Sequence, residues 1–118
     1  MYEISKQFSF SASHQLDGLP PEHQCARMHG HNYLVELVLQ AEELNEYGFV
    51  VDYLALRPFK TFIEENLDHR HLNDVFSFPT SAENLARYLY DWARQNWPQV
   101  TAVRVSETPK TWAEYRES

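Results

Sequence analysis

Three histidines carry the strongest chemical signal in this sequence. His29 and His31 are separated by one residue, so in an extended chain both side chains point to the same side. His14 ends an earlier stretch in which apolar and polar residues alternate. If that stretch pairs antiparallel with the segment that starts at His29, the end of one strand lies beside the start of the other. The three imidazoles then converge, a donor set that suits Zn²⁺ and leaves a fourth coordination position open for water or substrate.

The same histidines allow two other interpretations. Cys25 could serve as a fourth ligand, which would close the site and make it structural. Alternatively, His29, His31 and Glu36 copy the first motif of a cupin, a metal-binding double-sheet barrel. The cupin motif has a glycine on each side, which this sequence lacks at positions 23 and 43, and two long helical segments fit badly in a small barrel. We therefore expect the open three-histidine zinc site.

The other histidines give weaker signals. His23 stands alone in a polar loop, and we expect it to be partly exposed and to have no role in the site. His69 and His71 repeat the spacing of the first pair, so they could form a second metal pair. The residues alone rank these two histidines equally.

The elements that must position these side chains begin with a hairpin. Residues 8–14 alternate with period 2, and residues 31–40 are rich in β-branched and aromatic side chains, so both segments are predicted strands. The polar segment 15–28 between them contains a glycine and two prolines and is a predicted loop. Gly48 predicts a turn, followed by a short extended piece at 49–52.

Two helices are predicted in the second half of the chain. The segment 53–67 carries apolar residues at offsets of 3, 4 and 4, which is a helical stripe. Pro58 belongs in the first turn, so that helix starts near Leu56. The second helix covers about 81–96 and opens with a capping box that begins at Thr80.

A last alternating segment at 100–106 is a further predicted strand. The order of the elements is strand, strand, helix, helix, strand. This order predicts an α+β fold in which two helices cover one face of an antiparallel sheet. With 118 residues and no repeat or linker, the chain is expected to form one domain spanning residues 1–118.

Composition excludes several classes of function. The chain has 10 Lys and Arg against 17 Asp and Glu, a net charge of −7, which argues against binding to nucleic acid or to an anionic membrane. Mean hydropathy is −0.56, and no segment is long and apolar enough to be a predicted membrane span. The single cysteine and the absence of a secretion signal at the N-terminus favour a reducing compartment, and we expect a cytoplasmic protein.

Three motifs in order resemble one known family. They read Cys25-Ala-Arg-Met-His29-Gly-His31-Asn-Tyr33, then Leu67-Asp68-His69 with Leu72-Asn73-Asp74, and finally Glu107-Thr-Pro with Trp112 and Tyr115. They resemble the 6-pyruvoyltetrahydropterin synthase family over nearly the whole chain, and within it the bacterial 6-carboxytetrahydropterin synthases of the queuosine pathway. The resemblance implies the tunnelling fold (T-fold), in which subunits join their sheets into a barrel, usually as a homohexamer made of two trimers. It also implies that active sites lie at subunit interfaces.

The resemblance assigns roles to individual residues. It implies that the zinc ligands are His14, His29 and His31, in agreement with the strand geometry, and that Cys25 is the general base. A thiol has an ordinary pKa of about 8.5, and it becomes a usable base once a nearby cation lowers that value.

Four further positions match the family. Asp68 and His69 match the family's proton relay. Because the side chains of adjacent residues in a strand or helix point apart, these two residues can bond each other only at a turn. Glu107 matches the residue that grips the pterin ring and assists the relay, because a carboxylate can accept from two parallel N–H donors. Ser81 takes the place of a hydroxyl that helps to seat the pterin, in a loop with one more residue than the family pattern.

The implied reaction converts 7,8-dihydroneopterin 3′-triphosphate to 6-carboxy-5,6,7,8-tetrahydropterin with release of acetaldehyde and triphosphate. The alternative enzyme is 6-pyruvoyltetrahydropterin synthase, which keeps the side chain; the three residues between Cys25 and His29 favour the carboxy branch. An alternative of another class is a non-catalytic, zinc-stabilised pterin-binding module. The candidates for holding the triphosphate are Arg27, Arg70, Arg104 and Lys110.

Overall fold

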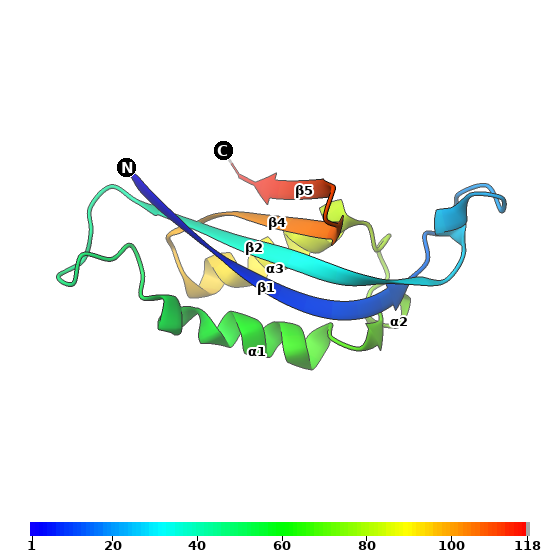
Figure 1. The fold of residues 1–118 in the computed structure, drawn as a ribbon, viewed down its shortest axis with the longest axis horizontal. Helices are drawn as coiled ribbons and strands as arrows, with labels where there is room; N and C mark the ends of the chain where they lie inside the picture. The colour runs from blue at the N-terminus through cyan, green and yellow to red at the C-terminus, as the bar shows by residue number, and fades with distance from the viewer. Residues whose placement is uncertain (118) are drawn as a thin grey trace.

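The computed structural model describes residues 1–117 and has two layers, a five-stranded sheet and a layer of helices (Figure 1). The strand order is β3-β1-β2-β4-β5. The elements are β1 (Tyr2–His14), η1 (Gln24–Ala26), β2 (His29–Ala41), η2 (Tyr53–Leu56), α1 (Arg57–Asn66), β3 (Arg70–His71), α2 (Leu72–Val75), α3 (Ala82–Asn96), β4 (Val100–Thr108) and β5 (Thr111–Arg116). The expected α+β class is confirmed: α1 and α3 lie on the same side of the sheet, and α2 is a single turn.

The centre of the fold is a long ladder between β1 and β2. Both strands have 13 residues, and they pair antiparallel without interruption from Tyr2 opposite Ala41 to His14 opposite His29. The strands predicted at 8–14 and 31–40 are therefore confirmed, and β1 is extended at its start. Because side chains alternate across a sheet, this register decides which residues share a face with the histidines.

One face of the sheet packs against the helices and forms the core. Phe8, Val35 and Val105 face this side and are buried, and the ring of Phe8 meets that of Phe59 in α1 edge to face at 5.0 Å. Leu89 adds the contribution of α3 to the same core. The other face is polar and carries charged pairs such as Arg104 with Glu36. Burial of apolar side chains therefore determines which face of the sheet the helices cover. The three histidines lie on this covered face.

The helix starts differ in part from the prediction. A short 3₁₀ turn, capped by the Asp52 carboxylate accepting from the Leu54 N–H, leads into α1, and Pro58 lies in the first turn as expected. The capping box expected at Thr80 is wrong, because the residue that caps α3 is Ser81, whose hydroxyl accepts from the Asn84 N–H. The Thr80 side chain is instead fully buried.

Four elements were not predicted: the short turn η1, β3, α2 and β5. β5 follows β4 after a tight turn, and β3 and α2 occupy the segment between the two long helices. The extended piece expected at 49–52 belongs to an irregular loop. Both β3 and β5 are short and half exposed, so the alternation of apolar and polar residues that identifies longer strands is missing there.

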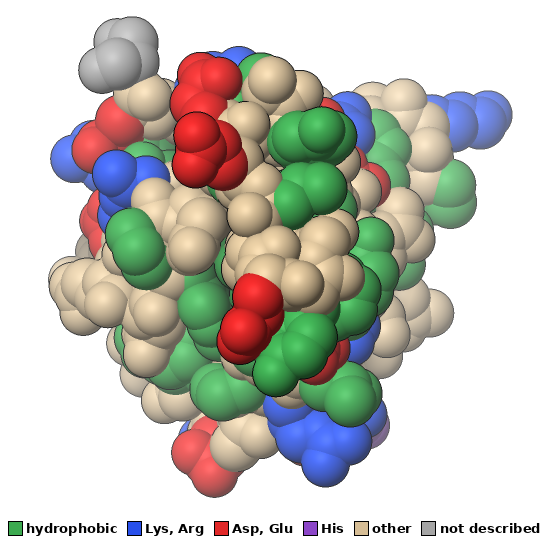
Figure 2. All heavy atoms as spheres, turned by 90° about the vertical axis from the view of Figure 1, so that its left-hand side faces the viewer, with side chains coloured by type: hydrophobic (Ala, Val, Ile, Leu, Met, Phe, Trp, Pro, Cys, Tyr) green, Lys and Arg blue, Asp and Glu red, His purple; other side chains and the backbone are tan. Residues whose placement is uncertain are grey.

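The molecule is elongated, with dimensions of 55 × 27 × 24 Å, and its two ends differ. The loop 15–28 extends from the sheet at the end where the histidines lie (Figure 1). At the opposite end, exposed apolar side chains gather around the chain start and the loop after β2 (Figure 2). They are Met1, Tyr2, Leu44, Tyr47, Phe49, Tyr53 and Leu54. No helix within residues 1–117 has the length and apolar character needed to cross a bilayer.

Candidate metal centre and active site

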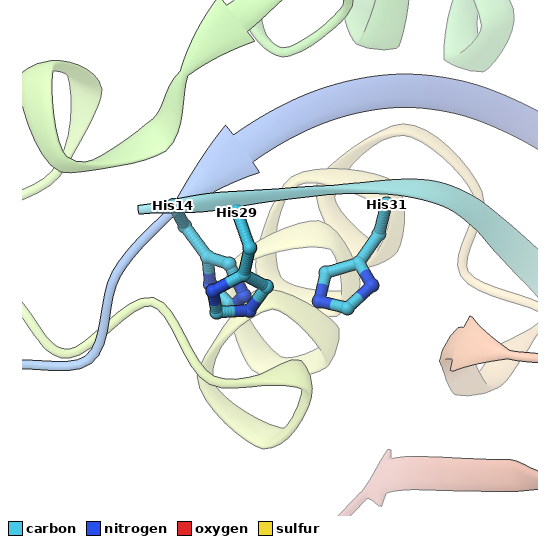
Figure 3. A group of neighbouring side chains, drawn as sticks. All are labelled: His14, His29 and His31. Carbon is cyan, nitrogen blue, oxygen red and sulfur yellow. The ribbon is translucent and has the colours of Figure 1, made fainter. Parts of the chain in front are cut away.

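Three imidazoles meet on the helix-covered face, where β1 ends and β2 begins (Figure 3). His14 lies directly opposite His29, and His31 lies opposite Ala12, so all three side chains share one face. One ligand nitrogen from each ring lies within 4.8 Å of the other two. The convergence predicted from the strand pattern is therefore present in the structure.

Hydrogen bonds orient two of the rings toward a common point. The Nδ1 of His14 lies 2.8 Å from the carbonyl oxygen of Thr80, and the Nδ1 of His29 lies 2.7 Å from that of Arg27. Because a carbonyl oxygen only accepts, each Nδ1 carries the proton and each Nε2 keeps a free lone pair. This arrangement, in which a carbonyl fixes the tautomer of a histidine, is typical of metal ligands.

The donor atoms fit a metal ion because they are otherwise unsatisfied. Among the described residues, the Nε2 atoms of His14 and His31 are buried and form no hydrogen bond. Burial lowers the pKa of both imidazoles, so they are neutral at pH 7, the form that binds metal. Buried polar atoms without a partner are uncommon in proteins, and here the three imidazoles offer the nitrogen donors that Zn²⁺ prefers.

Glu107 reaches this cluster from β4. It extends the row of Val103 and Val105 on the covered face, and its Oε2 lies 3.2 Å from the Nε2 of His31. This distance is short enough for an ion pair, but the carboxylate and the His31 ring are not oriented for a hydrogen bond. The carboxylate is thus beside the histidines and remains able to accept from another donor.

Cys25 is held in the loop next to the cluster. It occupies the short η1 turn and is half-buried, and its carbonyl oxygen accepts from the Leu16 N–H at 2.8 Å. Within residues 1–117, the Cys25 sulfur is not one of the atoms gathered within 4.8 Å. The structure therefore gives no support to Cys25 as a fourth ligand.

His23, for which no role was predicted, caps the turn that carries Cys25. Its Nδ1 accepts from the Cys25 N–H at 3.1 Å, the task that Ser, Asp or Asn performs at most helix starts. In the sequence, the feature that could have indicated this capping role is the position of His23 two residues before Cys25.

Asp68 and His69 form a pair at a turn after α1. His69 has a φ of 59°, a left-handed conformation that non-glycine residues adopt rarely. This conformation supplies the turn that adjacent residues need, and the Asp68 Oδ2 lies 3.0 Å from the His69 Nδ1. The other oxygen, Oδ1, accepts from the Ser11 N–H at 2.9 Å. The Ser11 bond, with a smaller contribution from His69, lowers the pKa of the Asp68 carboxyl.

The His69 imidazole does not lie with the other histidines of the same chain. It is 82% exposed and lines a hollow of about 460 Å³ with Ser11, Ser13 and Asn32. These three residues alternate with the buried ones, so they belong to the polar face of the sheet. The structure thus gathers His14, His29, His31 and Glu107 but leaves the relay pair apart from them.

Several alternatives lose support from the side-chain positions. Glu36 lies on the polar face, where it pairs with Arg104 at 3.1 Å, so it cannot join His29 and His31 in a cupin-like site. The Nδ1 of His71 lies 2.9 Å from the Ser13 hydroxyl. Arg104, one candidate for holding the triphosphate, is likewise engaged on the polar face, and Arg70 donates to the carbonyl oxygen of Glu65.

Two residues beside the cluster were missed by the sequence analysis. The Thr80 carbonyl orients His14 across 66 positions of sequence, and no local pattern indicates such a contact. Tyr33 was visible in the first motif, but its fully buried position under the histidines was not. Its ring stacks on Phe10 at 4.7 Å.

Comparison with known proteins agrees with this geometry. The family model described as 6-pyruvoyl tetrahydropterin synthase matches residues 3–118. The chain is 33% identical over 131 residues to the 6-carboxy-5,6,7,8-tetrahydropterin synthase of Bacillus subtilis, covering 98% of this chain and 85% of that protein. It is 31% identical over 131 residues to the 6-pyruvoyl tetrahydrobiopterin synthase of Drosophila melanogaster, covering 96% and 78%.

A solved structure extends the agreement to the fold. The 6-pyruvoyl tetrahydropterin synthase of Caenorhabditis elegans superposes with a TM-score of 0.86 at 26% identity, covering 99% of this chain and 96% of that one. The T-fold expected from the motifs is therefore confirmed. The family match over nearly the whole chain, the shared fold and the identities above 30% lead to one conclusion: this chain belongs to the 6-pyruvoyl tetrahydropterin synthase family.

Proposed function

We propose that this protein is a zinc-dependent carbon–carbon lyase, a 6-carboxytetrahydropterin synthase. It would convert 7,8-dihydroneopterin 3′-triphosphate and water to 6-carboxy-5,6,7,8-tetrahydropterin, acetaldehyde and triphosphate in queuosine biosynthesis. The observation that carries the proposal is the cluster of three imidazoles, in which one ligand nitrogen from each ring lies within 4.8 Å of the other two, beside Glu107. The name of the Bacillus subtilis relative supports the carboxy branch over the pyruvoyl branch.

The histidines would hold the metal, and the cysteine would move a proton. In this proposal His14, His29 and His31 are the zinc ligands, and bound Zn²⁺ supplies Lewis-acid polarisation of substrate oxygens. Cys25 acts as the general base: its thiolate removes a proton from the substrate side chain. The half-buried turn that carries it lies in the loop between two of the ligands.

Glu107 would hold the pterin ring. The 2-amino-4-oxo pyrimidine presents two parallel N–H donors, and a carboxylate accepts both. In the structure this carboxylate forms no hydrogen bond with the nearby imidazole, so its oxygens are available to those donors. Ser81 is proposed as a further contact to the pterin; its oxygen caps α3, and its hydroxyl hydrogen can still be donated.

The oxidation and reduction balance within the substrate. The bond between the first two side-chain carbons breaks, the terminal two carbons leave as acetaldehyde, and the carbon attached to the ring becomes a carboxylate. The side-chain carbons lose two electrons overall. The pterin ring gains these two electrons and becomes the tetrahydro form, while triphosphate departs. No nicotinamide is therefore required.

A second copy of the chain would complete the site. Asp68 and His69 are the proposed relay, but among the described residues His69 is not part of the group that gathers its nitrogens with His14, His29 and His31, and it lines a hollow that also contains Ser11, Ser13 and Asn32 of the polar face. We therefore propose that each active site combines the histidine cluster of one copy with the relay pair of another, in a homohexamer. In this arrangement a proton can be returned to the substrate on the side opposite Cys25.

Open strand edges support such an assembly. β3 pairs only with Ala12 and Ser13, and the backbone of Ser11 bonds to Asp68 and His69, so residues 2–10 of β1 have a free edge within the described chain, and the outer edge of β5 is free as well. Unpaired edges readily bind another strand.

The proposal also places the protein in the cytoplasm, as a single pterin-converting domain without a nucleic-acid or membrane partner. Its net charge of −7 supports this view, because both nucleic acids and most membrane surfaces are anionic.

The release of acetaldehyde tests the proposal directly. The zinc-loaded protein is incubated with 7,8-dihydroneopterin triphosphate, and acetaldehyde and triphosphate are measured, with Cys25→Ala as the inactive control. Equal amounts of both products are expected. Triphosphate without acetaldehyde would identify a 6-pyruvoyltetrahydropterin synthase, and binding of the substrate without either product would identify a binding module.

A further inference from the structure

The hydroxyl of Tyr33 is a buried polar group without a hydrogen-bond partner in the described chain. Tyr33 is 0% exposed, and within the described chain its oxygen forms no hydrogen bond. An unpaired buried hydroxyl destabilises a protein by about 1–3 kcal/mol. Phenylalanine would fill the same space without that cost, so the hydroxyl calls for an explanation in another state of the site.

The ring lies directly beneath the metal cluster. Its centroid is 5.4 Å from that of His31 and 6.0 Å from that of His14, with edge-to-face geometry in both cases. On its other side it stacks on Phe10. The ring is therefore fixed from several directions, and the hydroxyl can only meet a partner that moves toward it.

Glu107 and Tyr33 approach each other beside His31. The ladder between β2 and β4 ends with Leu34 opposite Ser106, and Tyr33 and Glu107 are the residues just beyond that last pair, where β4 becomes irregular between Val105 and Thr108. The ring centroid of Tyr33 lies 5.4 Å from that of His31, and the Oε2 of Glu107 lies 3.2 Å from the Nε2 of the same histidine. Both side chains therefore contact His31 from neighbouring strands, which brings the hydroxyl within reach of a flexible glutamate.

The Glu107 carboxylate needs another partner once the imidazoles are occupied. In the structure its Oε2 lies 3.2 Å from the Nε2 of His31, the atom that the proposed metal site would use. A carboxylate that turns away from His31 can reach Tyr33, whose O–H is an unused donor within the described chain. That bond would satisfy the Tyr33 hydroxyl and fix the direction in which Glu107 faces the pterin.

We propose that Tyr33 is the positioning residue for Glu107: its hydroxyl donates to the carboxylate in the substrate-ready state and orients it toward the two N–H donors of the pterin. This inference rests on the proposed function, since it gives Glu107 the role of gripping the ring. It adds a specificity element, because an oriented carboxylate rejects rings that lack one of those donors.

A double-mutant cycle on pterin binding tests the inference. The variants are Tyr33→Phe, Glu107→Ala and the double variant, with Tyr90→Phe as the matched control for a buried tyrosine in α3. The probe is neopterin, whose fluorescence reports its Kd, and the discriminating ligand is a lumazine with the same side chain as neopterin, in which an oxygen replaces the 2-amino group. Binding is measured with and without zinc, and KM and kcat for dihydroneopterin triphosphate are measured in parallel.

We expect Tyr33→Phe to raise the neopterin Kd and the KM about tenfold, as for the loss of a hydrogen bond to a charged group, and to leave kcat within about twofold. The preference for neopterin over lumazine should shrink, and the double variant should bind no worse than Glu107→Ala alone. The melting temperature should stay equal or rise, because an unpaired hydroxyl is removed.

Other outcomes overturn the inference. Unchanged neopterin binding in Tyr33→Phe, or an effect that adds fully to that of Glu107→Ala, would show that the hydroxyl does not act through the carboxylate. The wild-type assay separates this result from a failure of the proposed function: wild-type protein that binds neopterin but releases no acetaldehyde contradicts only the reaction. Wild-type protein that does not bind neopterin contradicts both.

Discussion

The imidazoles of His14, His29 and His31 extend from two paired 13-residue strands, whereas the imidazole of His69 follows a turn and is 82% exposed. The first group is gathered and partly buried within one chain. The second faces a hollow on the opposite side of the sheet. The difference teaches that one chain gathers the three proposed metal ligands by itself, whereas it leaves His69, the proposed relay residue, on an exposed turn.

The largest expected effect is the loss of the metal half. His29→Ala removes one of three ligands, so the protein should no longer retain zinc through gel filtration, and acetaldehyde release should fall below detection. The measurement is zinc content per chain by atomic absorption, with circular dichroism to show that the fold persists. His71→Asn is the control and should keep its zinc; equal zinc loss in that variant would mean that the metal lies elsewhere.

The next largest effect separates the thiol from the metal. Cys25→Ala should retain one zinc per chain yet lose turnover by about 10²–10⁴-fold, the usual contribution of a general base. Gln24→Ala, in the same turn, should turn over normally. Zinc loss together with the thiol would instead favour the closed structural site.

Mixing two inactive variants tests whether Cys25 and His69 act in the same active site from two different copies of the chain. The Cys25→Ala and His69→Ala variants are unfolded and refolded together in equal amounts. If chains assort randomly around shared sites, the mixture should recover about a quarter of the wild-type activity. Each variant refolded alone should remain inactive. Failure to recover activity in oligomers shown by mass spectrometry to be mixed would place both residues in one chain.

A smaller effect is expected at the turn that presents the thiol. His23→Ala removes the cap of η1 and should lower kcat about fivefold, the factor that corresponds to a lost capping bond. His23→Asn should restore most of the activity because asparagine also caps. Amide hydrogen exchange at Cys25 should rise in the alanine variant only; no change there would show that the bond to His23 is not formed in solution.

The smallest effect concerns the pH dependence of stability. The folded protein holds the pKa of Asp68 below its ordinary value of 3.8, mainly through the Ser11 N–H. A carboxyl with a lowered pKa contributes stability above its ordinary pKa, and this contribution is lost as pH falls through the folded value. Asp68→Asn should therefore reduce the free energy of unfolding by about 1 kcal/mol at pH 7 and flatten its decline below pH ~4.

Urea unfolding of both proteins between pH 7 and pH 3 measures this difference. Asp74→Asn, an exposed carboxylate in the first turn of α2, is the control. A parallel decline in wild type and Asp68→Asn would show that the Ser11 bond does not hold the turn.

The metal half of the site was predictable from sequence because it depends on local periodicity. His29 and His31 share a face by the period of a strand, and a hairpin brings His14 beside them. The α+β class followed from the same kind of pattern. Roles that depend on the family, those of Cys25 and Glu107, came from the resemblance and stay predictions.

The rest could not be predicted because it depends on distant or unusual geometry. The bond between Asp68 and His69 needs a positive φ at a histidine, which no composition rule indicates. The contact of Thr80 with His14 spans 66 positions, and the capping box that fitted Thr80 by spacing was wrong because Ser81 fills that place. The capping role of His23 was missed because a histidine is an uncommon residue at a helix start.

The uninterrupted ladder between β1 and β2 has a consequence for the maturation of the protein. A shift of β1 by one residue would turn His14 to the polar face, since each step along a strand reverses the side. A misaligned hairpin could still collapse, but it could not chelate an ion. If the three histidines bind zinc as proposed, the ion would stabilise only those chains in which the two longest strands are correctly aligned.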